Sequence, residues 1–125
     1  MILPGSAAAT GKKGEKLAAE YLRSRGYKIL ARNIRSAHGE IDIIAENREY
    51  LVFAEVKTRT DNPEYFANYG FPAEAVNKQK QRHIIYTAEV FLQKYPVEKA
   101  IRFDVIEVLL GVKVRFNHIE DAFRL

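Results

Sequence analysis

Hydrophobic residues recur along this chain with two different periods, and the change of period separates helices from strands. Residues 12–25 place their apolar side chains in one sector of a helical wheel, which predicts an amphipathic helix that ends before Gly26. A second helix is predicted over residues 75–95, because apolar side chains repeat there at three- and four-residue intervals and Pro96 follows. Its apolar stripe consists of Ile84, Ile85, Ala88, Phe91, Leu92 and Tyr95.

Strands are predicted where β-branched residues alternate or run together. Three candidate strands, residues 27–34, 40–45 and 51–56, follow the first helix, and a polar hairpin loop separates the last two. Residues 100–110 form a strong candidate strand and residues 112–116 a weaker one. The order helix, three strands, helix, two strands predicts an α/β fold in which helices flank one central mixed sheet.

The remaining segments predict the domain organisation. Residues 1–11 are small or apolar and include Pro4 and Gly5, so a flexible leader is expected before a single domain over residues 12–125. Residues 58–75 form a long polar and aromatic loop, and loops of this length in compact domains tend to be functional or mobile. Its rings, which could stack on unpaired bases or hold the loop against the core, are Tyr65, Phe66, Tyr69 and Phe71.

Composition narrows the class of protein. With 125 residues, 47% of them hydrophobic and 29% charged, the chain is typical of one globular domain. No apolar run is long enough to span a membrane and no secretory signal is recognisable, so no membrane partner is expected. The lack of cysteine excludes disulfides, thiolate metal sites and cysteine nucleophiles, and fits a reducing cytoplasm. A net charge of +4 suits a polyanionic partner, although many basic domains bind no nucleic acid.

The most unusual polar residues are Asp42, Glu55 and Lys57, which lie on two neighbouring candidate strands. Glu55 and Lys57 are two residues apart, so a strand presents them on the same face. A hairpin with an even-numbered loop, such as residues 47–50, places Asp42 directly opposite Glu55, whereas a shift of one residue would put Asp42 on the other face. Opposed carboxylates repel, and a divalent cation together with the Lys57 ammonium would compensate them.

A plainer interpretation is that these charges lie on a solvated strand face, where Glu55 and Lys57 form a surface ion pair. The run over residues 51–56 is too apolar for such a strand, and charges within it are costly unless they are paired or bound to metal. We therefore favour a Mg²⁺ site formed by Asp42 and Glu55, to which the backbone carbonyl of Val56 could add a ligand.

Glu15 is a further candidate because it lies at the margin of the apolar sector of the first helix. There it could lean over the sheet towards Asp42 and Glu55. Stabilisation of the helix start by a carboxylate near the positive end of the macrodipole explains Glu15 almost as well. Both interpretations stay open on the helical pattern alone.

Three stretches of this sequence carry a resemblance to a known family. They are Gly14-Glu15, Gly39-Glu40-Ile41-Asp42-Ile43-Ile44-Ala45 and Val52-Phe53-Ala54-Glu55-Val56-Lys57-Thr58-Arg59, with further likeness at Ala75-Val76-Asn77-Lys78 and Arg102-Phe103-Asp104-Val105-Ile106. The pattern resembles the YraN-type family of bacterial proteins, which is similar to archaeal Holliday-junction resolvases of the PD-(D/E)xK nuclease superfamily. The motif proline is replaced by Ile41, and the glutamine helix motif of some relatives has no clean match, although Gln81 lies on the second helix.

The resemblance implies a restriction-endonuclease-like fold and a nuclease that depends on Mg²⁺ or Mn²⁺. It assigns catalysis to Glu15, Asp42, Glu55 and Lys57, with the carboxylates as metal ligands and Lys57 beside the reacting water. The implied partner is DNA, duplex or branched, and symmetric cutting of a junction would need a homodimer. Basic residues suited to the DNA backbone are Lys12, Lys13, Arg59, Lys78, Lys80 and Arg82, although each is also an ordinary solvated residue.

Two hypotheses from other classes compete with an endonuclease that hydrolyses DNA. One is a nucleic-acid-binding module on the same fold without useful turnover, and the other is a basic scaffold that binds a protein through an apolar patch. The three histidines, His38, His83 and His118, are too scattered for a metal site and are interpreted as structural. Asp104 faces away from its apolar strand neighbours, and we expect it to have a structural, hydrogen-bonding role.

Overall fold

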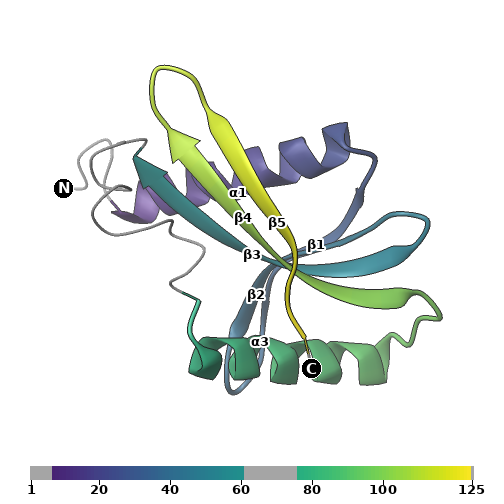
Figure 1. Ribbon diagram of the computed structural model, residues 1–125. Helices are drawn as coiled ribbons and strands as arrows, with labels where there is room; N and C mark the ends of the chain where they lie inside the picture. Colours follow the sequence, from purple (N-terminus) through teal and green to yellow (C-terminus); the bar gives the residue numbers. More distant parts are fainter. Residues whose placement is uncertain (1–6, 61–75, 125) are drawn as a thin grey trace.

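A computed structural model describes residues 7–60 and 76–124 of the chain, except the side chains of residues 7–10. The helices and strands follow in the expected order, α-β-β-β-α-β-β (Figure 1). They are α1 (Ala7–Ser24), β1 (Lys28–Arg35), β2 (Glu40–Glu46), β3 (Tyr50–Thr60), α3 (Lys78–Lys94), β4 (Ala100–Leu110) and β5 (Arg115–Phe123). The predicted α/β fold class is therefore confirmed.

The five strands form one mixed sheet in the order β1-β2-β3-β4-β5. Neighbouring strands are antiparallel except β3 and β4, which run parallel along their whole length because the chain between them includes α3. The two helices cover opposite faces of the sheet (Figure 1). No helix among the described residues is long and apolar enough to cross a membrane.

Each face of the sheet has its own hydrophobic core, and β3 contributes to both. Val52 and Ala54 pack with the α1 side chains, whereas Leu51 and Phe53 pack with those of α3. All four are at most 1% exposed, which confirms the sequence argument that this strand is covered on both faces. The charged residues of the same strand, from Glu55 onward, therefore lie where β3 passes from the buried core to a partly exposed region.

The hairpin between β2 and β3 has the register that the sequence argument required. Its ladder runs from Glu46 opposite Leu51 to Ile43 opposite Ala54, and the next step of the same register brings Asp42 opposite Glu55. The turn is fixed by the Asn47 side chain, whose Oδ1 accepts from the Tyr50 N–H at 2.8 Å. Such side-chain turns hold a tight hairpin in one register.

The helix boundaries differ from the expected ones. The first helix begins at Ala7 rather than at residue 12, so residues 7–11, which include the good helix former alanine, continue the helix instead of belonging to a leader. Residues 1–6 lie outside the described part. The second helix begins at Lys78 after the N-cap Asn77, and Tyr95 is its C-cap residue, 59% exposed and not part of the buried stripe.

The strands β3 and β5 also extend beyond their predicted ends. β3 continues to Thr60 because its polar last residues pair with β4, so the predicted loop begins later, and residues 61–75 with their four aromatic rings lie outside the described part. β5 spans Arg115–Phe123 instead of residues 112–116. Its pairing with β4 is interrupted by a bulge, and Asp121 has a φ of 54°, so the alternating pattern that predicts a strand is broken there.

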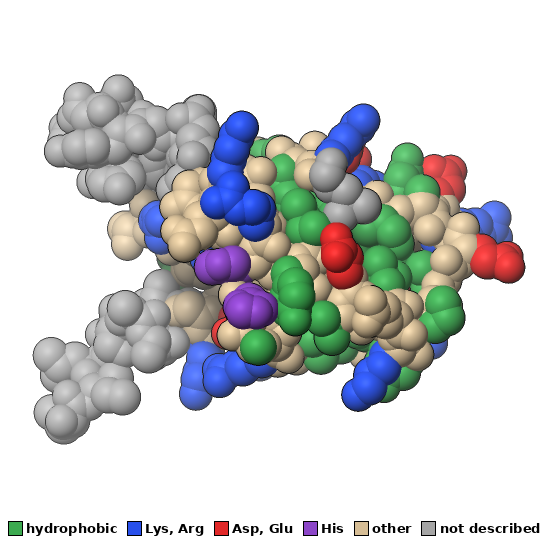
Figure 2. Space-filling model, turned by 90° about the horizontal axis from the view of Figure 1, so that it is seen from below, with side chains coloured by type: hydrophobic (Ala, Val, Ile, Leu, Met, Phe, Trp, Pro, Cys, Tyr) green, Lys and Arg blue, Asp and Glu red, His purple; other side chains and the backbone are tan. Residues whose placement is uncertain are grey.

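Figure 2 shows the molecule from the side of α3, where apolar side chains gather between basic ones. Four large hydrophobic residues of α3 and the segment after it are exposed, namely Tyr86, Val90, Tyr95 and Val97. The sequence offered only the aromatic loop as an apolar patch for the protein-binding scaffold hypothesis, and this face of α3 is another apolar surface that such a scaffold would use.

Candidate metal centre and active site

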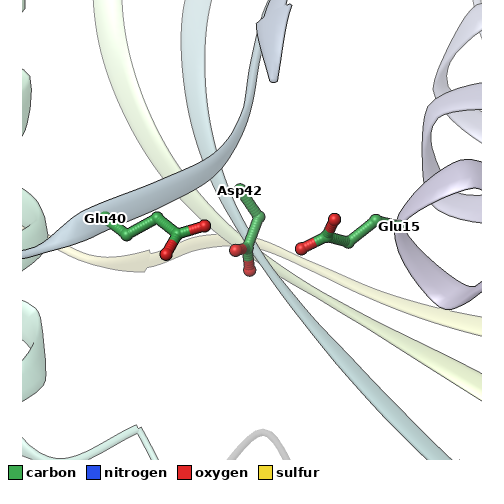
Figure 3. Close-up of side chains that lie close together, drawn as sticks. All are labelled: Glu15, Glu40 and Asp42. Carbon is green, nitrogen blue, oxygen red and sulfur yellow. The ribbon is translucent and has the colours of Figure 1, made fainter. Parts of the chain in front are cut away.

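Three carboxylates from two elements converge beside the sheet. Glu15 reaches over from α1, while Glu40 and Asp42 come from β2, two residues apart (Figure 3). One oxygen from each lies within 4.8 Å of the others. We call these three residues the carboxylate cluster; Asp42 lies between its two partners (Figure 3).

A glycine lets α1 approach the sheet closely enough for Glu15 to take part. A Cβ atom on Gly14 would lie 1.7 Å from the Thr58 Oγ1 on β3, a distance that no pair of atoms tolerates without displacement. The residue before Glu15 therefore needs to lack a side chain. This explains the Gly14-Glu15 pair as a positioning device, and it favours the site interpretation of Glu15 over a helix-start carboxylate.

The outer two carboxylates receive partners from β1. Arg32 Nη2 lies 3.9 Å from Glu15 Oε2, and Arg35 Nε lies 3.5 Å from Glu40 Oε2. Asn33, whose φ of 54° is unusual for a residue with a side chain, turns its amide toward both. In the orientation that satisfies its hydrogen bonds, the amide nitrogen donates to Glu40 at 3.1 Å and to Glu15 at 3.2 Å.

Asp42 is less well compensated. Its Oδ2 accepts a hydrogen bond from the Val56 N–H at 2.8 Å. Burial, followed by the negative charge of Glu55, outweighs this bond and raises the pKa of Asp42 to about 8. Without a cation, therefore, burial and Glu55 favour the protonated form of Asp42.

Two lysines approach one oxygen of Glu55, which is 5% exposed. Lys57, on the same strand face as predicted, places its Nζ 3.5 Å from Glu55 Oε1, and Lys80 of α3 places its Nζ 2.6 Å from the same atom. Burial and the neighbouring Lys80 lower the pKa of Lys57. Burial also acts to lower the pKa of Lys80, but the hydrogen bonds to Glu55 and Lys57 and the nearby negative charges together outweigh it and raise this pKa. We call Lys57 and Lys80 the lysine pair.

The carboxylates and the lysine pair lie where two open grooves meet. One groove, of about 620 Å³, extends past Glu15 and Lys57 to the end of β3, and the other, of about 400 Å³, extends between Glu40 and the start of α3. Asp42, Glu55 and Lys80 line both grooves. A chain-like substrate lying along the two grooves would pass directly over these three residues.

The structure brings Glu15, Asp42, Glu55 and Lys57 into one region. Sequence reasoning missed Glu40, although it is two residues from Asp42, the same spacing that singled out Glu55 and Lys57. It also assigned Lys80 only to the DNA backbone. Val56 donates its N–H to Asp42, and the role of its carbonyl as a metal ligand stays a prediction.

The other basic candidates surround this region at different depths. Arg59 is half-buried and lines the larger groove. The remaining four are exposed and lie on the two helices, Lys12 and Lys13 on α1 and Lys78 and Arg82 on α3. Exposure leaves their ammonium and guanidinium groups available to a polyanion, as it does for any solvated residue.

The donor set of the carboxylate cluster fits a hard divalent cation. Its ligand atoms are carboxylate oxygens, which Mg²⁺ and Mn²⁺ prefer, and their mutual distances suit a single ion that keeps several waters. Glu55 adjoins Asp42 and could add a further oxygen. A cation there would also favour the ionised form of Asp42, which the apo site disfavours.

Comparison with known proteins places this chain among bacterial relatives of the same length. It matches the family described as "Uncharacterised protein family UPF0102" over residues 14–108. UPF0102 proteins of Persephonella marina and of Clostridium botulinum strain 657 are 44% and 47% identical to it, and each match covers 92% of this chain and at least 93% of the relative. The matched range includes every residue of the carboxylate cluster and the lysine pair. As the sequence motifs indicated, the chain belongs to the UPF0102 family, the YraN-type proteins.

Proposed function

We propose that this protein is a metal-dependent endonuclease that hydrolyses phosphodiester bonds in DNA. The observation that carries the proposal is the convergence of the carboxylate cluster on Asp42, beside a buried Glu55 that is already paired with lysine. Buried carboxylates that disfavour one another's ionised form destabilise the folded state. They are typical of sites that bind a cation or perform acid–base chemistry.

Each residue has a distinct role in this proposal. Glu15, Glu40, Asp42 and Glu55 would hold Mg²⁺ or Mn²⁺, which supplies polarisation of the phosphoryl oxygen and acidification of a bound water. Lys57 would orient the attacking water or accept its proton, and in its charged form it would stabilise the negative charge that develops on the phosphate. Its lowered pKa makes proton transfer near neutral pH easier than for a solvated lysine.

The DNA would lie along the two grooves, where basic residues flank its path. Arg59 at the end of β3 and the exposed lysines and arginine of α1 and α3 would contact the phosphate backbone. Structure-selective cutting of junction-like DNA is the narrower form of the proposal, and it requires a homodimer. The cysteine-free composition is consistent with action in the cytoplasm.

A nucleic-acid-binding module without turnover is the second candidate, and one observation favours it. The lysine pair already neutralises Glu55 in the metal-free protein, so a basic surface is present without any cation. Such a module would bind DNA equally well with and without Mg²⁺.

The test incubates the protein with duplex, single-stranded, flap and four-way DNA in Mg²⁺ and in Mn²⁺. We expect metal-dependent cleavage of at least one substrate, and a loss of about 10²- to 10⁴-fold in rate for Lys57→Ala at unchanged DNA affinity. The control is Lys94→Ala, which removes the same charge from the far end of α3. A wild type that cleaves none of these substrates, while binding them independently of metal, would support the binding module instead.

A further inference from the structure

Lys80 differs from the other basic residues of α3 because a capping hydrogen bond holds its backbone and an ion pair holds its ammonium group at the site. It lies in the first turn of the helix, where its N–H donates to the Oδ1 of the N-cap Asn77 at 2.8 Å. Its Nζ makes the shorter of the two lysine contacts with Glu55, 2.6 Å against 3.5 Å for Lys57. The helix therefore delivers this ammonium to the centre of the site.

The two lysines differ in their freedom to move. The Lys80 side chain is 43% exposed, whereas that of Lys57 is 17% exposed. Lys80 also lines both grooves, while Lys57 lines only the larger. Lys80 is thus the member of the pair that can turn toward a ligand in either groove, because its side chain is more exposed than that of Lys57.

The charges around Lys80 indicate which anion it would contact without a bound cation and which with one. In the metal-free protein, both ammonium groups of the lysine pair lie beside the Glu55 carboxylate. A divalent cation bound by Glu55 would repel these ammonium groups and compete with Lys80 for the carboxylate oxygens, so Lys80 would need another anionic partner. A phosphodiester is an anion of the right kind, and charge-assisted contacts between lysine and phosphate are strong.

We propose that Lys80 is an active-site residue with two partners in turn: Glu55 in the metal-free protein, and the phosphate of the substrate once the carboxylates hold a cation. This inference rests on the proposed function. It makes Lys80 the residue that couples the two ligands, because its departure from Glu55 favours cation binding and its new contact favours DNA. The phosphate contact would also place a positive charge where negative charge develops during hydrolysis.

The experiment compares Lys80→Met with Lys94→Met, which removes the same charge from an exposed residue in the last turn of the same helix. The first readout is Mn²⁺ affinity without DNA, measured by calorimetry. Lys80→Met should bind Mn²⁺ about tenfold more tightly than wild type, since a charge-assisted hydrogen bond to Glu55 no longer competes. Lys94→Met should leave Mn²⁺ affinity unchanged, and Lys80→Arg should restore the wild-type value.

The second readout is the dependence of DNA affinity on Mn²⁺, with cleavage prevented by the additional Lys57→Ala substitution. In the Lys57→Ala background Mn²⁺ should tighten DNA binding, and with Lys80→Met added this enhancement should disappear. With Lys57 intact, cleavage by Lys80→Met should fall about 10²-fold or more. Thermal unfolding verifies that each variant folds, and Lys80→Gln replaces Lys80→Met if the latter does not.

The outcomes separate the two proposals. A wild type that binds no Mn²⁺ overturns both the proposed function and the role of Lys80. A wild type that binds Mn²⁺ and cleaves DNA, with Lys80→Met indistinguishable from Lys94→Met in both binding readouts, overturns the role of Lys80 alone.

Discussion

Two aspartates of this protein, Asp104 and Asp42, receive very different numbers of hydrogen bonds and counter-charges. Asp104 is fully buried and receives Arg102 Nε at 2.9 Å and Nη2 at 2.8 Å, His118 Nε2 at 2.6 Å and the Asp121 N–H at 3.0 Å. Asp42 accepts one backbone hydrogen bond and faces the charge of Glu55. We call Asp104 and its partners, completed by the Tyr21 and Tyr27 hydroxyls, the Asp104 network.

The pKa values of the two aspartates shift in opposite directions for this reason. Burial favours the protonated form of both carboxylates. At Asp104 the hydrogen bonds from His118 and Arg102 outweigh burial and lower the pKa, whereas at Asp42 burial and Glu55 together raise it. Burial alone therefore does not distinguish a structural carboxylate from a functional one; the supply of partners does.

Within the Asp104 network, Asp104 itself is fully buried, although Arg102 and Asp121 line an open groove of about 620 Å³. The Arg102 guanidinium lies over the rings of Tyr50 at 4.7 Å and Tyr27 at 5.7 Å. The structural roles predicted for Asp104 and His118 fit these contacts. The difference lies in the aspartates themselves, because Asp42 lines both grooves of the site.

The largest effect on stability should come from Asp104→Asn. This change leaves Arg102, whose side chain is 8% exposed, without its bidentate counter-ion, and should lower the free energy of unfolding by about 3–5 kcal/mol. Urea unfolding at pH 7 measures it. If the free energy of unfolding falls by less than about 1 kcal/mol, the Asp104 network does not have the structural role that we assign to it.

Asp104→Asn should lower the free energy of unfolding, whereas Asp42→Asn should raise it relative to wild type in the metal-free protein as pH rises. The folded pKa of about 8 lies above the unfolded value of about 3.9, so the native state binds the extra proton and stability falls as pH rises through this interval. The slope attributable to Asp42 is at most about 1.4 kcal/mol per pH unit. Urea unfolding in EDTA from pH 5 to pH 8.5 should show a wild type that loses stability relative to Asp42→Asn. Parallel curves for the two proteins would contradict the assignment.

Gly14→Ala should damage the carboxylate cluster and spare the Asp104 network. The new Cβ collides with Thr58, so α1 has to shift, at a cost of about 1–3 kcal/mol, and Glu15 moves with it. Mn²⁺ affinity should fall together with stability. Gly11→Ala is the matched control, because nothing lies within 4 Å of its Cβ, and it should stabilise the helix by about 0.5–1 kcal/mol at unchanged Mn²⁺ affinity.

The smallest effect is expected for Tyr21→Phe. It removes one hydrogen bond, at 3.1 Å to His118 Nδ1, while the ring remains stacked on Phe116 at a centroid distance of 4.6 Å. A loss of about 1 kcal/mol in urea unfolding is expected, with no change in Mn²⁺ affinity. A change in Mn²⁺ affinity would show that the two groups of charges are coupled through the sheet.

The sequence by itself determined the order of elements, the two-sided burial of β3 and the hairpin register that brings Asp42 opposite Glu55. These features follow from local periodicity and turn chemistry, which are written in consecutive residues. The bulged edge strand β5 was predicted poorly because a bulge breaks the period on which the prediction depends.

The tertiary structure alone decided which charges meet. Glu15 and Lys80 come from helices on opposite faces of the sheet, and their approach to Asp42 and Glu55 depends on the close packing at Gly14 and on the cap at Asn77. Burial and partners then set the pKa of Asp42 high and that of Asp104 low, although both are aspartates within strands. Residue type and spacing name the candidates for a site, but desolvation and charge pairing depend on distances between elements that sequence periodicity does not encode.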